Sequence, residues 1–355
     1  MRKAVLFVSV YTMSGSFDGA ALLAQQHISD GPRVGDAPSD KISGSTRADT
    51  RNILCSTKIN QPNSQLGVQS KARWFCASGT RLMTANGIPN HATGQFPSAN
   101  DPYSIAGQTI TYAATQSPVV RSEAGQPIKV PGYALNGIKF DASTTGRCRS
   151  DTTDPSTCDL VEGNGPWDIE VLGQATFDFG ADENHGHVQS TGEYHYHGIP
   201  VGMLSAANKA GQAMQLIGWA ADGFPIYARY GHHDPEISTS ALRPMKSSYR
   251  LKAVPDANRP DTAILPMGTF TQDFEYSRGT GDLDECNGRF GVTPEFPEAI
   301  YHYYATDSFP FIQRCVKGFP YSLSSQATPV AEPRQDDEEE GRRDRRPPPP
   351  GGPRW

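Results

Sequence analysis

Residues Asp182 to Pro200 read D-E-N-H-G-H-V-Q-S-T-G-E-Y-H-Y-H-G-I-P, and they carry four of the nine histidines of the chain as two H-x-H pairs. The S-T-G tripeptide between the pairs predicts a three-residue hairpin loop, because glycine enters the left-handed region at no steric cost. This loop makes Gln189 and Glu193 the first cross-strand pair. The ladder then pairs Val188 with Tyr194, His187 with His195, Gly186 with Tyr196, and His185 with His197.

The predicted register places four imidazoles on one face of the hairpin, because side chains alternate between faces along a strand. Neighbouring strands lie roughly 5 Å apart, so these rings can converge on one ion at about 2.0–2.1 Å per nitrogen. The predicted metal ligands are therefore His185, His187, His195 and His197. Glu183 and Glu193 have the same parity and could complete a mixed set. A bulge at Gly192 would change the register, and the alternative is a solvated hairpin whose histidines only stack.

Imidazole-rich sites suit copper, zinc, nickel or iron, and the absence of a thiolate among the predicted ligands favours copper or zinc. Three ligands and an open position would make a catalytic site, whereas four closed ligands would make a structural or storage site. Tyr194 and Tyr196 point away from the histidines by parity, which favours core packing over radical chemistry. The chain has no HExxH motif, G-x-S-x-G elbow, P-loop or dinucleotide fingerprint.

The motif and several other stretches resemble the YHYH domain family, which takes its name from that tetrapeptide. The resemblance extends over about residues 80 to 320 in collinear blocks, but it implies no activity. Besides D-E-N-H-G-H-V-Q and G-E-Y-H-Y-H-G-I-P, the blocks are Asn86–Pro97, Gly132–Asp141, Ala221–Tyr227, Asp282–Gly291, Tyr301–Tyr303 and Phe309–Phe311.

An internal echo of the motif indicates two related halves. D-E-N-H-G-H at Asp182 is followed in the same order by D-E-C-N-G-R at Asp284, and Y-H-Y-H at Tyr194 by Y-H-Y-Y at Tyr301. Chance similarity is the alternative, because only short motifs match. In this alignment Asn287, Arg289 and Tyr304 replace three of the histidines, and only His302 keeps its imidazole. His302 would complete the first site if the two hairpins packed face to face.

Composition limits the fold and the partners. The 35 glycines and 29 prolines favour short strands and turns over helices, and Met203–Leu216 is the one helix-like stretch. The formal net charge of −6 gives no basic footprint for nucleic acid, and no apolar run reaches the roughly 18 residues of a membrane span. His91 lies alone in a loop, where a structural hydrogen bond is favoured over a role as an extra ligand.

The N-terminal segment and the cysteines indicate export. Residues 1–24 read as a signal peptide, with Arg2 and Lys3 before an apolar segment, although a first buried strand is the alternative. Six cysteines without a C-x-x-C pair suggest disulfides, and the simplest pairing joins neighbours in sequence. These pairs are Cys55 with Cys76, Cys148 with Cys158, and Cys286 with Cys315. Lone buried thiols are the alternative to disulfides.

The sequence therefore predicts a mainly β domain at 51–325, made of short antiparallel strands and hairpins with few helices. A polar leader at 25–50 precedes it, and a disordered acidic, basic and proline-rich tail at 326–355 follows. The tail could support weak association, though solubilising filler is favoured. The predicted location is secreted, periplasmic or cell-surface.

Two functional classes remain open. The first is an exported metal-binding protein or metalloenzyme, and the second is an adhesion or scaffold domain with a purely structural hairpin. A cell-surface or small-molecule partner would fit either class, and the sequence does not decide whether the protein is an enzyme.

Overall fold

The fold is mainly β, as the sequence predicts. The computed structural model describes residues 47–144, 146–161, 163–206 and 212–321, and all of these belong to one compact unit, Ala37–Trp355. The expected signal peptide, most of the expected leader and the expected tail lie outside the described residues. Within the described ranges, none of the helices has the length and apolar character needed to cross a membrane.

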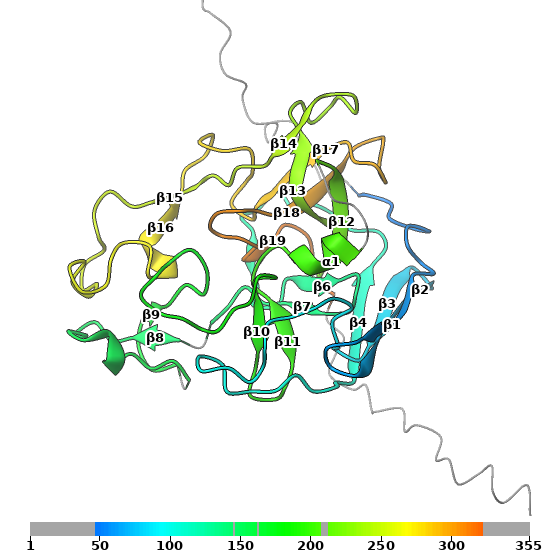
Figure 1. Cartoon of the computed structure of the whole chain (residues 1–355). Helices are drawn as coiled ribbons and strands as arrows, with labels where there is room; N and C mark the ends of the chain where they lie inside the picture. The colour runs from blue at the N-terminus through cyan, green and yellow to red at the C-terminus, as the bar shows by residue number, and fades with distance from the viewer. Residues whose placement is uncertain (1–46, 145, 162, 207–211, 322–355) are drawn as a thin grey trace, which may run out of the picture. The chain divides into compact units, whose positions relative to one another are not determined.

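A nine-stranded sheet forms the centre of the fold and carries the motif hairpin at one edge (Figure 1). The main path of this sheet runs β10-β11-β7-β6-β12-β13-β18-β17, and β14 pairs with β13. The strands are β6 (Gly132–Ala134), β7 (Lys139–Phe140), β10 (Gly186–Val188), β11 (Tyr194–Tyr196), β12 (Met214–Ala220), β13 (Pro225–His232), β14 (Leu242–Pro244), β17 (Gly288–Gly291) and β18 (Ile300–Ala305).

The order of the strands shows that the main path of the sheet, without β14, consists of two equivalent halves. In the first half, hairpin β6–β7 adds hairpin β10–β11 through a parallel pairing of β7 with β11. In the second half, hairpin β12–β13 adds hairpin β17–β18 through a parallel pairing of β13 with β18. The halves meet where β6 pairs antiparallel with β12. The relation between the two hairpins that the sequence echo indicates therefore extends to the whole sheet.

The tight turns of the two inner hairpins are also equivalent. Asn136 and Asp222 occupy the same turn position, and the backbone bonds Ala134 N–H to Ile138 O and Ala220 N–H to Phe224 O match. With this alignment, Tyr133 is equivalent to Trp219, and these two residues face each other in the β6–β12 pairing. The pairing on either side, Gly132 with Ala220 and Ala134 with Gly218, is reciprocal.

The two outer hairpins share the register that the sequence predicts for the first of them. In β10–β11, Gly186, His187 and Val188 lie opposite Tyr196, His195 and Tyr194. In β17–β18, Gly288, Arg289 and Phe290 lie opposite Tyr303, His302 and Tyr301. The predicted S-T-G loop is confirmed as well, since Gln189 N–H bonds to Glu193 O and Gly192 has φ = 82°.

A buried tyrosine hydroxyl requires glycine at the start of each outer hairpin. The Tyr194 hydroxyl donates to Asp182 Oδ2 at 2.8 Å, and the Tyr301 hydroxyl donates to Asp284 Oδ2 at 2.8 Å. A Cβ added at Gly186 or Gly288 would collide with the hydroxyl of the neighbouring tyrosine. Gly186 and Gly288 therefore leave space for the tyrosine–aspartate hydrogen bond of their own hairpin, which joins its second strand to the turn before its first strand.

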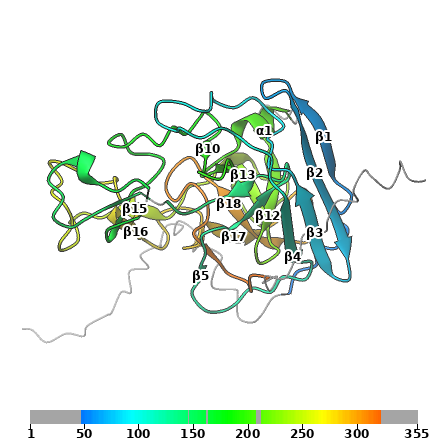
Figure 2. The same cartoon turned by 90° about the horizontal axis from the view of Figure 1, so that it is seen from below.

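A second sheet of four antiparallel strands packs on the central one (Figure 2). In β2, the side chains of Ser70, Ala72 and Trp74 are buried at alternate positions, which is the period expected of a strand with one face on the core. Trp74 Nε1 donates to Leu135 O at 2.9 Å, and the Arg81 guanidinium lies 3.5 Å from the ring centroid of Trp219. The strands are β1 (Lys58–Asn63), β2 (Val68–Ala77), β3 (Thr80–Ala85) and β4 (Ile110–Thr115).

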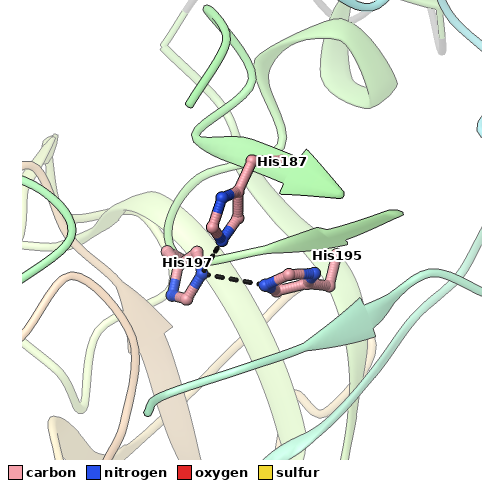
Figure 3. A group of neighbouring side chains, drawn as sticks. All are labelled: His187, His195 and His197. Atoms are coloured by element: carbon pink, nitrogen blue, oxygen red, sulfur yellow. Dashed lines mark hydrogen bonds between the residues drawn. The ribbon is translucent and has the colours of Figure 1, made fainter. Parts of the chain in front are cut away.

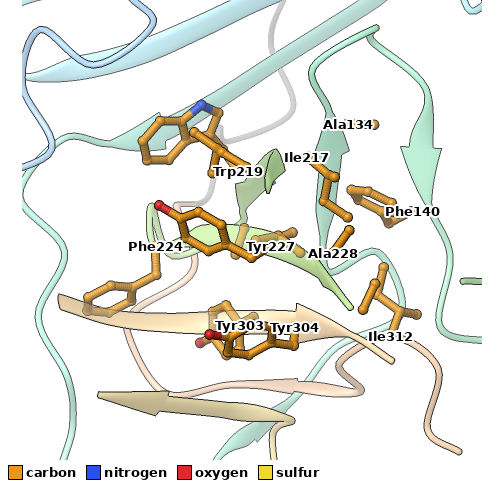
Figure 4. Packing of buried hydrophobic residues seen from close by; sticks show 14 of the residues in the cluster. Ala134, Phe140, Ile217, Trp219, Phe224, Tyr227, Ala228, Tyr303, Tyr304 and Ile312 are labelled. Atoms are coloured by element: carbon orange, nitrogen blue, oxygen red, sulfur yellow. The ribbon is translucent and has the colours of Figure 1, made fainter. Parts of the chain in front are cut away.

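The core lies along the central strands and is rich in aromatic rings. Trp219, Phe224, Tyr227 and Tyr303 are fully buried there (Figure 4). Both β12 and the first half of β13 are buried on both faces, which explains their nearly continuous apolar sequence. Burial of this kind supplies most of the free energy that holds the two halves together.

Three disulfides confirm the predicted pairing of neighbouring cysteines: Cys55–Cys76, Cys148–Cys158 and Cys286–Cys315. A small second core consists of Cys148, Trp167, Ile169, Leu265 and Phe270. The remaining strands form three two-stranded sheets. Their strands are β5 (Gln126–Pro127) with β19 (Cys315–Val316), β8 (Arg147–Cys148) with β9 (Trp167–Asp168), and β15 (Tyr249–Leu251) with β16 (Phe274–Tyr276). Two 3-10 helices, Pro155–Thr157 and Thr271–Asp273, complete the described elements.

The helix predicted at Met203–Leu216 is wrong over most of its described length. The helix α1 spans Val201–Ala206, and Met214 already begins β12. The alanines favour a helix locally. However, Met214, Gln215 and Leu216 are buried and pair with β13, and this tertiary context overrides the local preference.

Replacing either hairpin glycine should destabilise the fold. Gly186→Ala and Gly288→Ala are each expected to lower the free energy of unfolding by about 1–3 kcal/mol, because the added methyl group must displace a buried tyrosine hydroxyl. Gly107→Ala is the matched control, since a Cβ there meets no atom within 4 Å. Denaturant unfolding measures the effect. Equal midpoints for the three variants would contradict the close approach of tyrosine to glycine.

Candidate metal centre

The motif hairpin brings three of its histidines together. His187 and His195 are directly opposite each other in β10 and β11, and His197 follows two residues after His195. The Nε2 atoms of His187 and His195 each lie 3.0 Å from Nε2 of His197 (Figure 3). Nitrogen ligands of a tetrahedral ion stand about 3.3 Å apart. Small shifts of the rings would therefore suffice to place all three nitrogens around one ion.

Backbone carbonyls determine which ring nitrogen faces the centre of the cluster. Phe179 O lies 2.9 Å from Nδ1 of His187, and Glu193 O lies 3.4 Å from Nδ1 of His195. A carbonyl only accepts, so each Nδ1 carries the proton and each Nε2 presents a lone pair. The three Nε2 atoms therefore lie close together. If Nε2 of His197 carries the proton of that ring, this one N–H can donate to only one of the other two Nε2 atoms. Metal-binding histidines typically have one ring nitrogen bonded to a backbone carbonyl and the other directed at the ion, as in this cluster.

The three rings are neutral at physiological pH. Burial lowers the pKa of His187, and burial followed by the repulsion of neighbouring groups lowers the pKa of His195 and of His197 well below the ordinary value. Asp141 partly opposes this effect at His197. Neutral imidazole is the form that binds a metal, so protons compete weakly for these nitrogens.

The fourth predicted ligand, His185, does not lie with the other three. Its backbone has φ = 55°, outside the strand region, and β10 begins only at Gly186. The alternation of faces therefore stops before His185, and its Nδ1 contacts Ile199 O at 2.8 Å. Within the described residues, the group of side chains that could hold a metal consists of His187, His195 and His197.

The additional candidates also lie apart from this group. Glu193 Oε2 accepts from Lys139 Nζ at 2.9 Å, and Glu183 is exposed. His91 Nε2 contacts the hydroxyl of Tyr196, as a structural loop histidine would. His302 belongs to the hairpin at the opposite end of the main strand path, so the face-to-face packing that would let it complete the site does not occur.

The second hairpin shows what replaces the cluster. His302 Nδ1 contacts Ile300 O at 2.8 Å, and its Nε2 contacts the Tyr304 hydroxyl at 2.9 Å. Arg289 donates to that hydroxyl at 3.4 Å and to His232 O at 2.7 Å. Both nitrogens of His302 therefore have protein partners. Burial, reinforced by Arg289, lowers the pKa of His302 to about 3.

The three histidines open onto a pocket of about 540 Å³. Other loops contribute most of the wall, and their residues include two buried carboxylates, Asp101 and Asp141, that the sequence analysis missed. The lining residues are Asn100, Asp101, Pro102, Tyr103, Asp141, Ser143, Thr144, Leu160, Val161, Val171, Asp178, Phe179, His187, Val188, Gln189, Ser190, Thr191, His195 and His197. A ligand in this pocket could reach an ion at the histidines.

The buried side chain of Lys139 contacts residues that line this pocket. Lys139 lies opposite His195 in the parallel pairing of β7 with β11. Its Nζ lies 2.9 Å from Glu193 Oε2, 3.0 Å from Gln189 Oε1 and 3.3 Å from Asp141 Oδ2. Burial opposes ionisation of Asp141, but the hydrogen bond from Ser143 and the charge of Lys139 help to leave its pKa below the ordinary value.

Fold and site together define a class of protein. It is a β protein of two equivalent halves, in which the first outer hairpin holds three histidines at a pocket and the second holds one buried histidine whose two nitrogens have protein partners. The chain belongs to the YHYH protein family, because the family model described as YHYH protein matches residues 109–318, more than half of the chain. This range contains both halves of the central sheet and confirms the resemblance seen in the sequence. Comparisons with curated proteins and with solved structures gave no match.

Acid should destabilise the protein through His302. The folded-state pKa of about 3 lies below the ordinary value of 6.5, so unfolding takes up a proton between these values. The stabilising contribution is therefore complete above pH 6.5 and is lost as the pH falls toward 3. Between pH 6.5 and 4.5, protonation of His302 should cost the wild-type protein up to about 1.4 kcal/mol of unfolding free energy per pH unit. The His302→Gln variant should lack this contribution. Denaturant unfolding at several pH values tests this, and parallel curves for the two proteins would contradict it.

Proposed function

We propose that this protein is an exported metal-binding protein that holds a copper or zinc ion at His187, His195 and His197. The observation that carries the proposal is the convergence of three Nε2 atoms, two of which present lone pairs because backbone carbonyls orient their rings. Without an ion, at least one of these nitrogens faces another acceptor at short range, which is unfavourable in a buried site. A divalent ion would satisfy all three at once.

The ligand chemistry supports copper or zinc. Imidazole nitrogens suit zinc, copper, iron and nickel, whereas calcium and magnesium prefer oxygen. The six cysteines all form disulfides, so thiolates are not available to select a softer ion. The same disulfides, together with the charged and apolar N-terminal segment of the sequence, support the proposal of a secreted, periplasmic or cell-surface location.

The pocket favours a metal site with an exchangeable ligand, as opposed to a closed storage site. Three protein ligands and an open position are typical of catalytic zinc centres. The pocket of about 540 Å³ reaches His187, His195 and His197 and would give a small molecule access to the fourth position. We therefore propose that the ion meets a ligand there, as a binding module or as a metalloenzyme.

One observation favours the second function class, an adhesion or scaffold domain. Hairpin β17–β18 keeps the same register, tyrosines and glycine with Arg289 and Tyr304 in place of two histidines. The hairpin architecture therefore does not depend on a histidine cluster. Metal content separates the two classes.

The test is elemental analysis of the full chain, purified from its native compartment without a histidine tag. Wild-type protein should contain about one equivalent of copper or zinc, the stoichiometry of a mononuclear site. His187→Gln and His197→Gln should each lose the metal while keeping a cooperative unfolding transition, because each removes one of three ligands.

His185→Asn is the matched control for these variants. Asn287 occupies the equivalent position in the second hairpin with a similar backbone, φ = 59° against 55° for His185. This control should fold and keep its metal. A metal-free wild-type protein, or equal metal loss in the control, would contradict the three-histidine site and leave the scaffold function.

A further inference from the structure

The wall of the pocket combines negative charge with apolar surface. Asp101, Asp141 and Asp178 contribute carboxylates, and none of the described residues that line the pocket is a lysine or an arginine. The apolar part of the wall includes Pro102, Tyr103, Val171, Phe179 and Val188. A pocket of this composition discriminates between ligands by charge as well as by shape.

The cations behind the wall do not cancel this charge. Lys139 is shared by Asp141 and Glu193 at 3.3 and 2.9 Å. Arg314, whose charge also acts on His197, pairs with Glu170 at 2.6 Å. Lys139 and Arg314 thus form ion pairs with carboxylates other than Asp101 and Asp178.

Those two carboxylates are held in place by neutral donors. Asp101 is buried and accepts from the backbone N–H groups of Tyr103 and Val188 at 3.1 and 2.7 Å. Asp178 is exposed and accepts from the N–H of Gly180 at 2.8 Å. Neutral donors fix the position of a carboxylate without removing its charge. The low-dielectric walls of a pocket then concentrate the negative potential.

We infer that the pocket binds an organic amine, with the ammonium group drawn to Asp101 and Asp178 and an apolar body packed against Tyr103, Val171 and Phe179. The volume of about 540 Å³ admits a ligand of this kind. In the metal-free pocket, Asp101 and Asp178 repel carboxylates and phosphates of the same shape. This inference deepens the proposed function and rests on it for the ion that the ligand would approach.

The test compares three probes that share one skeleton and differ in charge: 2-phenylethylamine, 2-phenylethanol and 3-phenylpropionate. Each is titrated by calorimetry into the full chain, first after removal of metal with a chelator and then after reloading. In the metal-free protein the amine should bind most tightly and the carboxylate most weakly, and the preference for the amine should shrink as salt is raised.

A charge variant at the rim sharpens the test. Asp178→Asn should weaken amine binding about fivefold and leave alcohol binding unchanged, the scale of a partly exposed ion pair. Asp151→Asn removes the same charge from an exposed pair with Arg149 that does not line the pocket, and it should change neither affinity.

Three results would overturn the inference: binding of the carboxylate as tight as that of the amine, no binding of any probe, or equal losses in the two variants. Metal content is measured on the same preparations. A native protein without metal that keeps the amine preference would remove the proposed function and leave the pocket specificity standing.

Discussion

Four buried tyrosine hydroxyls constrain how the halves of this protein are built. Tyr194 and Tyr301 each donate to the aspartate that precedes their hairpin, and Tyr303 donates to Asp222 at 2.6 Å in an inner turn. The hydroxyl of Tyr196 accepts from Asn136 Nδ2 at 2.9 Å, in the equivalent inner turn. An unsatisfied buried hydroxyl is costly, so each tyrosine fixes the distance between its outer hairpin and its surroundings. Since alternate residues of a strand take opposite faces, burying the tyrosines forces the imidazoles together on the other face.

The two halves keep this framework and differ where chemistry would occur. His187 and His197 in the first half are replaced by Arg289 and Tyr304 in the second. Asp141 follows β7, whereas Tyr227 takes its place in β13. The first set leaves three imidazole nitrogens at a pocket, and in the second set both nitrogens of His302 have protein partners. The two equivalent halves thus provide an internal comparison in which similar backbones carry different sets of side chains.

The sequence predicts the parts of this structure that depend on local chemistry. The S-T-G loop defines the register of the first hairpin, the D-E-C-N-G-R and Y-H-Y-Y stretches identify the second, and cysteine spacing predicts the disulfides. Parity fails at His185, because it applies only while the backbone is extended and β10 begins one residue later. The position of Asp101 in the pocket could not be predicted from the sequence. It lies in a loop far from the motif in sequence, and only the tertiary fold brings it 2.7 Å from the N–H of Val188.

The pairing of β6 with β12 has a further consequence. Equivalent strands meet there, Tyr133 faces its counterpart Trp219, and the pairs on either side exchange roles. A contact in which residue i meets j while j meets i is isologous, which is the pattern of a two-fold symmetric dimer. The halves of one chain therefore meet as the two subunits of such a dimer do. Because each outer hairpin lies at an edge of the main strand path, far from this contact, the site side chains differ between the halves while the central contact stays symmetric.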